Sequence, residues 1–287
     1  MAITYNDLYL NTRAALKRQG VEMAQLEARE LVCYAAEKPR EQFFRDLNLY
    51  ASPAVEQRVS ELLRRREGGE PIAYLIGEWE FYGMTLDVTP DVLIPRPDTE
   101  LLVERGIELA QAAGEGARVL DLCAGSGCIG LAVAKHAPNC RVILADLSEA
   151  ALRVCRANVR RCDLNARVTC TPVNAMDPPS SALWDFDVIL CNPPYIPTDE
   201  IKTLDASVRE HEPILALDGG ADGLDFYRAI SSQWGNALRL GGSLLFEVGI
   251  HQAPAVEALL VQNEFEGVTV TPDPAGIPRM VEGRIPC

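Results

Sequence analysis

Hydrophobic residues in the first part of the chain recur three or four positions apart, which is the spacing of an amphipathic helix, and this continues up to about Gly68. Ser52 followed by Pro53 is typical of a helix start, because serine caps helices and proline suits the first helical position. The Gly68-Gly69 pair is typical of a helix end. Residues 1–70 are therefore predicted to form a small helical domain.

The pattern changes to an alternation of apolar and polar residues between Gly77 and Val88, with a turn at Gly83, as in a β-hairpin. Beyond the hairpin, short apolar runs alternate with helical segments, which is typical of a parallel sheet covered by helices. Because the hairpin lies between two regions of different pattern, residues 71–97 are predicted to form a linker that bridges two domains. The remainder predicts a doubly wound α/β domain over residues 98–287.

Strands and helices take turns along this predicted α/β domain. The predicted strands are 118–122, 141–146, 167–172, 188–191 and 243–248, with a last pair near 268–270 and 279–282. The predicted helices are 99–112, 128–136, 148–161, 225–238 and 252–262.

Composition and charge narrow the classes of function. Of the 287 residues, 48% are hydrophobic and 24% charged, as in ordinary globular proteins. The net charge of −14 argues against a large surface that neutralises phosphates, so no direct nucleic-acid binding is expected, and only a local basic patch stays open. No apolar run approaches the ~20 residues of a membrane span, and no signal peptide is evident. The protein is predicted to be cytoplasmic, without a membrane partner.

Metal and disulfide chemistry is not indicated by the sequence. The nine cysteines form no Cys-x-x-Cys motif and lie mostly in apolar segments, and the three histidines are far apart. The thiols are therefore predicted to be reduced and mostly buried, with no metal site.

The most informative motif is Asn192-Pro193-Pro194-Tyr195, named here the ledge, which follows the predicted strand 188–191. Ligands of open α/β sheets bind outside the carboxyl ends of strands, so Asn192 is placed where chemistry occurs. Two prolines fix φ and remove two donors, which leaves a rigid segment rich in acceptors. The Asn192 side-chain oxygen and the Pro193 carbonyl can accept the two N–H groups of a planar NH2, and Tyr195 offers a face for stacking. The alternative is an ordinary Asn-Pro turn.

A glycine-rich turn follows the first predicted strand of the α/β domain. It consists of Cys123, Ala124, Gly125, Ser126 and Gly127. With Gly130 it matches the GxGxxG pattern of dinucleotide folds, which stay a competitor. Asp121 favours another ligand, because its carboxylate would repel a pyrophosphate and could serve a cationic amino-acid cofactor such as S-adenosylmethionine. Asp146 closes the next strand, where it can accept both ribose hydroxyls of either ligand. Helix-capping or loop roles are the simpler alternatives for both.

This order of strand, glycine turn, acidic residues and ledge resembles the class I S-adenosylmethionine-dependent methyltransferases, whose sheet is Rossmann-like. The ledge is similar to that of enzymes that methylate planar amino or amide nitrogens. Over nearly the whole chain the sequence resembles the release factor glutamine-N5 methyltransferases, also called the HemK family. The segments that carry this resemblance are the helical N-terminal region, Gly77 to Tyr82, Ile94 to Glu100, the ledge with Ile196, and Asp218 to Leu224.

The resemblance implies the cofactor, the partner and the site. S-adenosylmethionine would contact the glycine turn, Asp146 and Asn192, and Asp121 is included on the reasoning above. The family's substrate is the glutamine of the Gly-Gly-Gln loop in class 1 peptide chain release factors, which implies protein methylation in translation termination. Asn192, Pro193, Pro194 and Tyr195 would bind this glutamine, and the helical domain would grip the release factor. Arg96 and Asp98 fit a loop over the cofactor pocket, or a salt-bridged linker.

One position departs from the family pattern. At the adenine edge the family commonly has an acidic residue followed by a large apolar or aromatic one, whereas this chain has Asn174 and Ala175. Asn174 can still accept a hydrogen bond from the adenine amino group. Either Met176 covers the adenine, or the correspondence shifts to Asp177.

A ledge without a neighbouring nucleophile predicts direct in-line transfer of a sulfonium methyl group to the glutamine nitrogen. Asn192, Pro193 and Tyr195 are the predicted catalytic residues, while Cys191 points to the opposite side of the strand. No general base is indicated, because the methylated amide nitrogen becomes more acidic and can lose its proton late. His211, flanked by glutamates, is interpreted as a surface histidine.

Three alternative functions stay open from the sequence. A nucleic-acid amino methyltransferase would need a basic groove and a target-recognition region, whereas the densest basic run is Arg64-Arg65-Arg66. A module that binds S-adenosylmethionine without catalysis is suggested by the altered Asn174-Ala175 pair. The third alternative is an enzyme that methylates a glutamine of a ribosomal protein.

Overall fold

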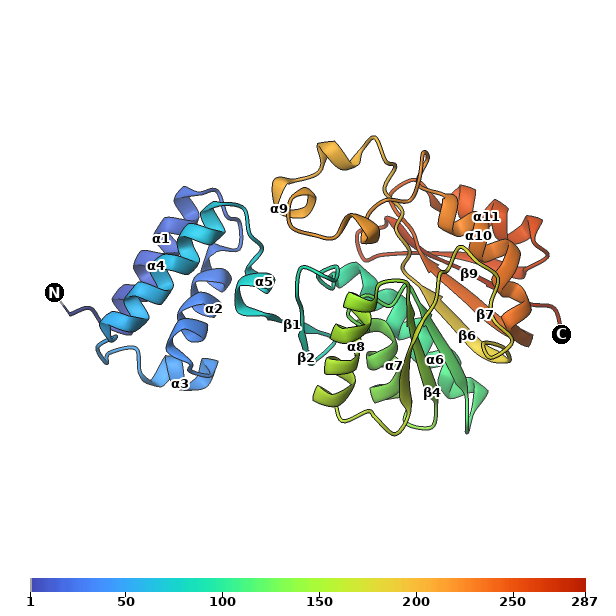
Figure 1. Ribbon diagram of the computed structural model, residues 1–287, viewed down its shortest axis with the longest axis horizontal. Coiled ribbons are helices and arrows are strands. Elements are labelled where there is room, and N and C mark those ends of the chain that lie inside the picture. The colour runs from blue at the N-terminus through green and yellow to red at the C-terminus, as the bar shows by residue number, and fades with distance from the viewer. Residues whose placement is uncertain (1) are drawn as a thin grey trace. The chain divides into compact units, whose positions relative to one another are not determined.

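The computed structural model describes residues 2–287 and divides them into two compact units (Figure 1). The first unit contains the chain up to Gly77 together with Asp205–His211. The second unit contains Glu78–Leu204 and Glu212–Cys287.

Helices build the first unit. They are α1 (Tyr5–Arg18), α2 (Ala24–Ala36), α3 (Arg40–Arg45), α4 (Pro53–Glu67), α5 (Ile72–Ile76) and the short α9 (Ala206–Arg209). Thr4 and Asp7 form a capping box at the start of α1, and the Ser52 hydroxyl caps α4 by accepting from the backbone N–H of Val55 at 3.3 Å. The predicted N-terminal helical region is confirmed.

The second unit begins with the predicted hairpin and continues into a seven-stranded sheet. The hairpin strands are β1 (Glu78–Phe81) and β2 (Met84–Asp87), and Tyr82 and Gly83 adopt the left-handed conformation that their tight turn requires. The strands of the sheet are β3 (Arg118–Leu122), β4 (Arg141–Asp146), β5 (Val168–Pro172), β6 (Phe186–Cys191), β7 (Leu238–Glu247), β8 (Glu266–Pro272) and β9 (Pro278–Arg284).

The strand order is β5-β4-β3-β6-β7-β9-β8, in which β9 alone runs antiparallel to all the other strands. Apolar side chains cover both faces of the sheet. One face packs against α6 (Glu100–Ala113), α7 (Cys128–His136) and α8 (Glu149–Arg161), and the other against α10 (Asp225–Gln233) and α11 (Ala253–Gln262) (Figure 1). The doubly wound α/β fold is therefore confirmed. Short 3₁₀ turns are η1 (Pro97–Thr99), η2 (Ile201–Thr203), η3 (Ile214–Ala216) and η4 (Trp234–Ala237).

This topology fixes the place where a ligand can bind. The chain runs from β3 outward to β4 and β5, and then crosses to β6 and β7 on the other side of β3. The carboxyl ends of β3 and β6 therefore flank the point where the direction of winding reverses. Ligands of open α/β sheets bind in the crevice at such a point.

Three predicted element boundaries were wrong. The helix predicted over 225–238 ends at Gln233, and β7 begins at Leu238 instead of residue 243, because the Gly241-Gly242 pair lies inside the strand. Gly242 passes so close to the Phe186 carbonyl oxygen that a Cβ would lie 2.9 Å from it. Likewise β6 begins at Phe186, two residues early, because the Asp187 carboxylate is neutralised by Arg239 at 2.7 Å.

Candidate active site

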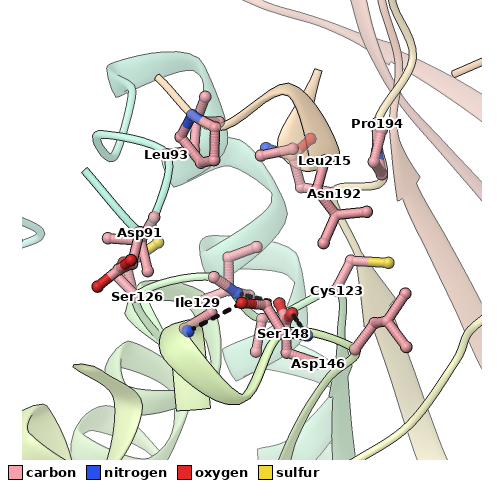
Figure 2. A pocket seen from close by; sticks show the side chains of 18 of the residues that line it. Asp91, Leu93, Cys123, Ser126, Ile129, Asp146, Ser148, Asn192, Pro194 and Leu215 are labelled. Atoms are coloured by element: carbon pink, nitrogen blue, oxygen red, sulfur yellow. Dashed lines mark hydrogen bonds between the residues drawn. The ribbon is translucent and has the colours of Figure 1, made fainter. Parts of the chain in front are cut away.

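A cavity of about 210 Å³ opens at the carboxyl ends of β3, β4 and β6 in the second unit (Figure 2). It brings together most of the residues that the sequence predicted for the cofactor. Those that line it are Cys123, Ala124, Gly125, Ser126, Asp146, Asn174, Ala175, Asn192 and Pro194. Asp121, Gly127, Pro193 and Tyr195 are not among the described residues that line this cavity. The segment carrying Leu93 lies across the cavity from Asn192 and Pro194 (Figure 2).

The glycine turn connects β3 to α7 and shapes the floor of the cavity. Cys123, Gly125 and Gly127 all have positive φ, and Gly127 is the N-cap of α7. A Cβ on Gly127 would lie 2.8 Å from Leu144, so this glycine allows the close packing of helix on sheet. A Cβ on Gly125 would meet nothing within 4 Å, because Gly125 borders open space at the cavity. The backbone of the turn is thus accessible to a ligand.

Asp146 and Asp91 are the carboxylates among the described residues that line the cavity, and Asp146 is the one that closes β4. Its Oδ2 accepts from the backbone N–H of Gly125 at 2.8 Å, and its Oδ1 accepts from the backbone N–H of Ser148 at 2.8 Å (Figure 2). Burial raises the pKa of Asp146, while these backbone hydrogen bonds lower it. Each oxygen keeps acceptor capacity beyond its backbone partner, so the side chain can receive two hydroxyl groups.

Asp121 lies behind the turn in a fully buried position. Its Oδ2 accepts from the backbone N–H of Gly130 at 2.8 Å, and its Oδ1 has no hydrogen-bond partner among the described residues. Burial raises its pKa to about 7, the Gly130 hydrogen bond lowers it, and the charge of Asp146 raises it. Its contacts support anchoring of the first turn of α7, while a contact with the cofactor stays a prediction.

Replacing Asp121 with asparagine is expected to stabilise the fold at pH 8. The native pKa of about 7 lies above the ordinary value of 3.8, so this carboxyl costs no stability below about pH 4, and its cost grows until the pH reaches 7. Asparagine keeps an acceptor for Gly130 and carries no charge. The gain in unfolding free energy should be about 2 kcal/mol larger at pH 8 than at pH 5.5, at about 1.4 kcal/mol per pKa unit. Urea unfolding at both pH values measures this gain, and one independent of pH would contradict the prediction.

The loop after β5 uses its polar side chain locally. Asn174 Oδ1 accepts from the backbone N–H of Met176 at 3.1 Å, and Asn174 Nδ2 donates to Asp177 at 3.0 Å. The Ala175 carbonyl accepts from the indole N–H of Trp234 at 3.0 Å, which fixes the backbone of the loop. Met176 is not among the described residues that line the cavity, so the suggestion that it covers an adenine there gains no support.

Sequence reasoning missed the aromatic ring of the cavity. Phe226, in the first turn of α10, is the only aromatic residue among the described residues that line it. Its signal was the apolar face of α10, which also predicts core packing, so the sequence alone gave no reason to prefer a site. Sequence reasoning also missed the apolar wall formed by Pro90, Val92 and Leu93 in the segment after the hairpin.

The ledge is held from behind by a glycine-rich loop, Asp218 to Leu224. The backbone N–H of Gly219 donates to the Ile196 carbonyl at 2.9 Å, which places the loop directly against the ledge. A Cβ on Gly219 would lie 2.8 Å from the Pro194 carbonyl oxygen, and one on Gly223 would lie 2.3 Å from that of Tyr195. These glycines are therefore required by the close approach of two backbones.

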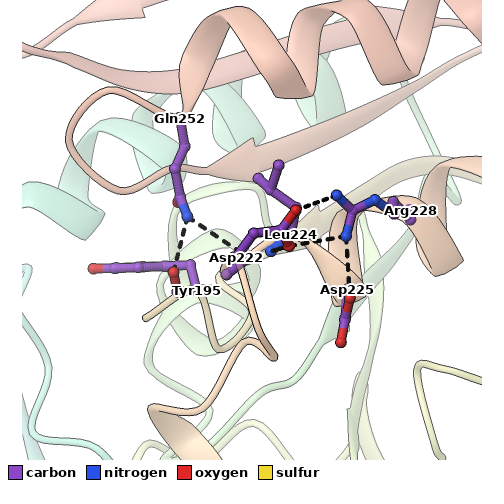
Figure 3. Close-up of polar contacts among 7 residues, drawn as sticks. Tyr195, Asp222, Leu224, Asp225, Arg228 and Gln252 are labelled. Carbon is purple, nitrogen blue, oxygen red and sulfur yellow. Dashed lines mark hydrogen bonds and ion pairs between the residues drawn. The ribbon is translucent and has the colours of Figure 1, made fainter. Parts of the chain in front are cut away.

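Gln252 fastens the ledge and the loop to each other. Its Nε2 donates to the Tyr195 carbonyl at 2.8 Å and to the Gly223 carbonyl at 3.2 Å (Figure 3). Its Oε1 accepts from the backbone N–H of Gly249 at 3.0 Å, which fixes the orientation of the amide. Arg228 forms ion pairs with Asp222 in the same loop and with Asp225 at the start of α10 (Figure 3). The ledge is a rigid platform because its backbone is braced along its length.

Arg96 combines the two roles considered for this segment, whereas Asp98 is not among the described residues that line the cavity. Arg96 lines the cavity and also forms an ion pair with Glu212. Asp98 forms an ion pair with Arg279 at 2.9 Å. His211 belongs to the first unit and does not line the cavity.

In residues 2–287 no group of three or more His, Cys, Asp or Glu side chains is placed to hold a metal ion, and the nine cysteines are free thiols. Over the same range, no helix is both long and apolar enough to cross a membrane. The lining of the cavity itself combines hydrogen-bond acceptors with apolar side chains beside the ledge.

Comparisons with known proteins agree with this architecture. A family model described as the methyltransferase small domain matches residues 97–220, and one described as the PrmC N-terminal domain matches residues 7–77. The chain is 41% identical to the release factor glutamine methyltransferase of Geobacter sulfurreducens, over 96% of this chain and 94% of that protein. It is 34% identical to the release factor glutamine methyltransferase of Clostridium acetobutylicum, over 96% of each chain.

Among solved structures, the catalytic domain of hMettl16 in complex with MAT2A 3'UTR hairpin 1 is similar to this chain, with a TM-score of 0.57 and 16% identity. The likeness covers 88% of this chain and 90% of that one. At this level of identity it shows a shared fold only.

Proposed function

The chain belongs to the release factor glutamine methyltransferase family, and on that premise we propose that it methylates the side-chain amide nitrogen (N5) of the glutamine in the Gly-Gly-Gln loop of class 1 peptide chain release factors. The observation that carries the proposal is Asn192, which lines the cavity and begins the braced ledge. One residue thus borders both the place for a cofactor and the place for an amide. The reaction would take place in the cytoplasm.

The cavity fits S-adenosylmethionine by the chemistry of its lining. Asp146 has acceptor capacity for the ribose hydroxyls, Gly125 leaves its backbone uncovered, and the ring of Phe226 offers an apolar surface for an adenine. When bound, this cofactor supplies an electrophilic methyl group on a sulfonium sulfur. The residues proposed to hold it are Asp121, Cys123, Ala124, Gly125, Ser126, Gly127, Asp146, Asn174, Ala175 and Asn192.

The ledge supplies orientation instead of covalent chemistry. The Asn192 side-chain oxygen and the Pro193 carbonyl accept the two N–H groups of the substrate amide, and Tyr195 stacks on its plane. An amide nitrogen is a weak nucleophile, so the rate depends on holding it in line, and good orientation contributes roughly 7–11 kcal/mol to lowering a barrier. The braces from Gln252 and the glycine-rich loop keep this geometry fixed.

The first unit is proposed to recognise the release factor. The domain boundaries proposed from the sequence are 1–70 for this helical domain, 71–97 for the linker and 98–287 for the methyltransferase domain. A net charge of −14 does not favour a nucleic-acid surface, which supports a protein substrate over a nucleic acid.

Methyl-labelled S-adenosylmethionine, a recombinant class 1 release factor and the purified protein test the proposal directly. We expect label on the glutamine of the Gly-Gly-Gln loop, located by mass spectrometry, and none on a release factor in which that glutamine is alanine. Absence of label on the unaltered release factor as well, with cofactor binding demonstrated by calorimetry, would overturn the proposed substrate. Ribosomal proteins and RNA in parallel reactions identify the alternative substrates.

A further inference from the structure

A buried carboxylate lies beside Asn192 on the neighbouring strand. In the parallel pair of β6 and β7, Cys191 is in register with Phe246, so the next residues, Asn192 and Glu247, follow at the same edge of the sheet. Glu247 is only 3% exposed, and its Oε2 has no hydrogen-bond partner among the described residues. Glu247 does not line the cavity and belongs to no motif considered above.

Thr99 completes a small polar cluster with these two residues. Asn192 Nδ2 donates to the Thr99 hydroxyl oxygen at 3.4 Å, and Thr99 is 2% exposed at the start of α6. Burial raises the pKa of Glu247 to about 7, while hydrogen bonding by the side chains of Thr99 and Asn192 lowers it. The nitrogen end of the Asn192 amide therefore faces a group that only accepts.

A buried carboxylate with an unpaired oxygen costs free energy, because the hydrogen bonds that this oxygen makes to water are lost and not replaced. An asparagine amide has two ends of similar shape, one that donates and one that accepts, and its surroundings decide which end points where. Acceptors on one side of Asn192 hold the NH2 group on that side. The Oδ1 atom is then left to face the opposite way, as the ledge requires.

We propose that Glu247 is a positioning residue, which together with Thr99 holds the Asn192 NH2 group inward so that Asn192 Oδ1 is presented to the substrate amide. The proposal rests on the proposed function for the identity of that substrate. Glu247 acts through Asn192 and touches neither substrate nor cofactor.

Glu247→Gln is the sharpest variant, because glutamine keeps the shape of the side chain but can donate as well as accept. Both orientations of the Asn192 amide then become possible. At saturating cofactor and release factor at pH 8, kcat should fall by about 10- to 100-fold, with the cofactor Kd unchanged within about threefold. In an Asn192→Ala background the same substitution should have no further effect on kcat, because the residue through which it acts is absent. An undiminished kcat in Glu247→Gln, or an equal loss in both backgrounds, would overturn the proposal.

A matched control is Glu282→Gln on the adjacent strand β9. Glu282 is 5% exposed like Glu247, but its carboxylate pairs with Arg105 at 2.6 Å. This variant should unfold at lower urea concentration and keep its kcat. Glu247→Gln should unfold at equal or higher urea concentration than wild type at pH 8, because it removes a buried charge that carries no full partner. Loss of activity without loss of stability separates positioning from a merely structural role.

The pH profile gives a second signature. Asp98 and Arg279 also face Glu247 but form an ion pair with each other, and burial raises the pKa values of Tyr195, Tyr227 and Cys128, which keeps them neutral near pH 7. Wild-type kcat should therefore fall below pH 7 as Glu247 gains a proton, and Glu247→Gln should lack this fall. Because Asp121 titrates in the same range, Asp121→Asn serves as the control that keeps the fall.

Hydrogen exchange of the Asn192 side-chain amide tests the positioning role without a methylation assay, and therefore independently of the proposed function. In protein labelled with ¹⁵N-asparagine, the side-chain amide of Asn192 is identified by its absence from an Asn192→Asp variant. Its hydrogen exchange should be slow in wild type and about tenfold faster or more in Glu247→Gln. Equal exchange rates would overturn the positioning role. This result holds whether or not a release factor is methylated.

Discussion

Replacing Asn192 with alanine is expected to lower kcat by about 10²- to 10³-fold, the range found when one preorganised hydrogen-bonding group is removed from an active site. The loss follows from the place of Asn192 at the start of the ledge, where its oxygen orients the nitrogen that reacts. The Pro193 carbonyl and the Tyr195 ring remain in the variant, so the amide still binds but no longer lies in line. The cofactor Kd should change by less than about fivefold, because Asp146 and the glycine turn are untouched.

Single-turnover methylation of a release factor separates kcat from binding in this experiment, and calorimetry gives the cofactor Kd. Asn139→Ala is the matched control, because Asn139 is an exposed asparagine between α7 and β4, outside the cavity lining. This control should retain wild-type values of both quantities. A kcat in Asn192→Ala that equals the control would remove Asn192 from the catalytic role.

The parts of the site that could be predicted from the sequence are those that follow buried strands directly. An apolar run followed by a polar residue places that residue at a strand's end, and this is how Asp146 and Asn192 were placed on one cavity. The glycine turn could also be predicted from the sequence, because a strand, glycines and an apolar helix occur in direct succession. The local sequence was sufficient to predict those parts of the site that consist of a strand and the turn directly after it.

Other parts depend on contacts between distant segments. Glu247 lies beside Asn192 only because of the register of β6 and β7, which pairs segments more than 50 residues apart. Phe226 and Leu93 line the cavity because α10 and the segment after the hairpin are carried there by the fold. No periodicity in either segment distinguishes a cavity wall from an ordinary core, so the sequence predicted neither.

For Asp121 the position in the strand could be predicted from the sequence, but the direction of its side chain could not. The sequence placed it correctly at the end of β3, but the pleat directs its side chain to the face covered by α7, where Gly130 donates to it. A one-residue difference in register would have turned the carboxylate to the other face. Periodicity alone does not decide which face of a sheet buried on both sides receives a polar residue.

Asp146→Ala is expected to raise the cofactor Kd by about 10²-fold or more, because hydrogen bonds to a charged group each contribute about 1.5–3 kcal/mol and a factor of ten corresponds to about 1.4 kcal/mol. The proposed ribose site loses both acceptors at once. The backbone N–H groups of Gly125 and Ser148 also lose the partner that fixes the glycine turn. The kcat at saturating cofactor should remain within about tenfold of wild type, because the ledge is unchanged.

A raised cofactor Kd with a nearly unchanged kcat is the reverse of the result expected for Asn192→Ala. The two variants together therefore test whether the cofactor and the amide bind at different places. If the cavity holds the cofactor and the ledge holds the amide, one substitution acts on Kd and the other on kcat. Asp146→Asn refines the assignment, because its NH2 group must face one of two backbone donors, so the turn loses one hydrogen bond while the side chain keeps one acceptor. Its Kd should lie between those of wild type and Asp146→Ala. A cofactor Kd in Asp146→Ala equal to that of wild type would place the ribose elsewhere, since no other carboxylate with both oxygens held by backbone N–H groups is found among the described residues of the cavity wall.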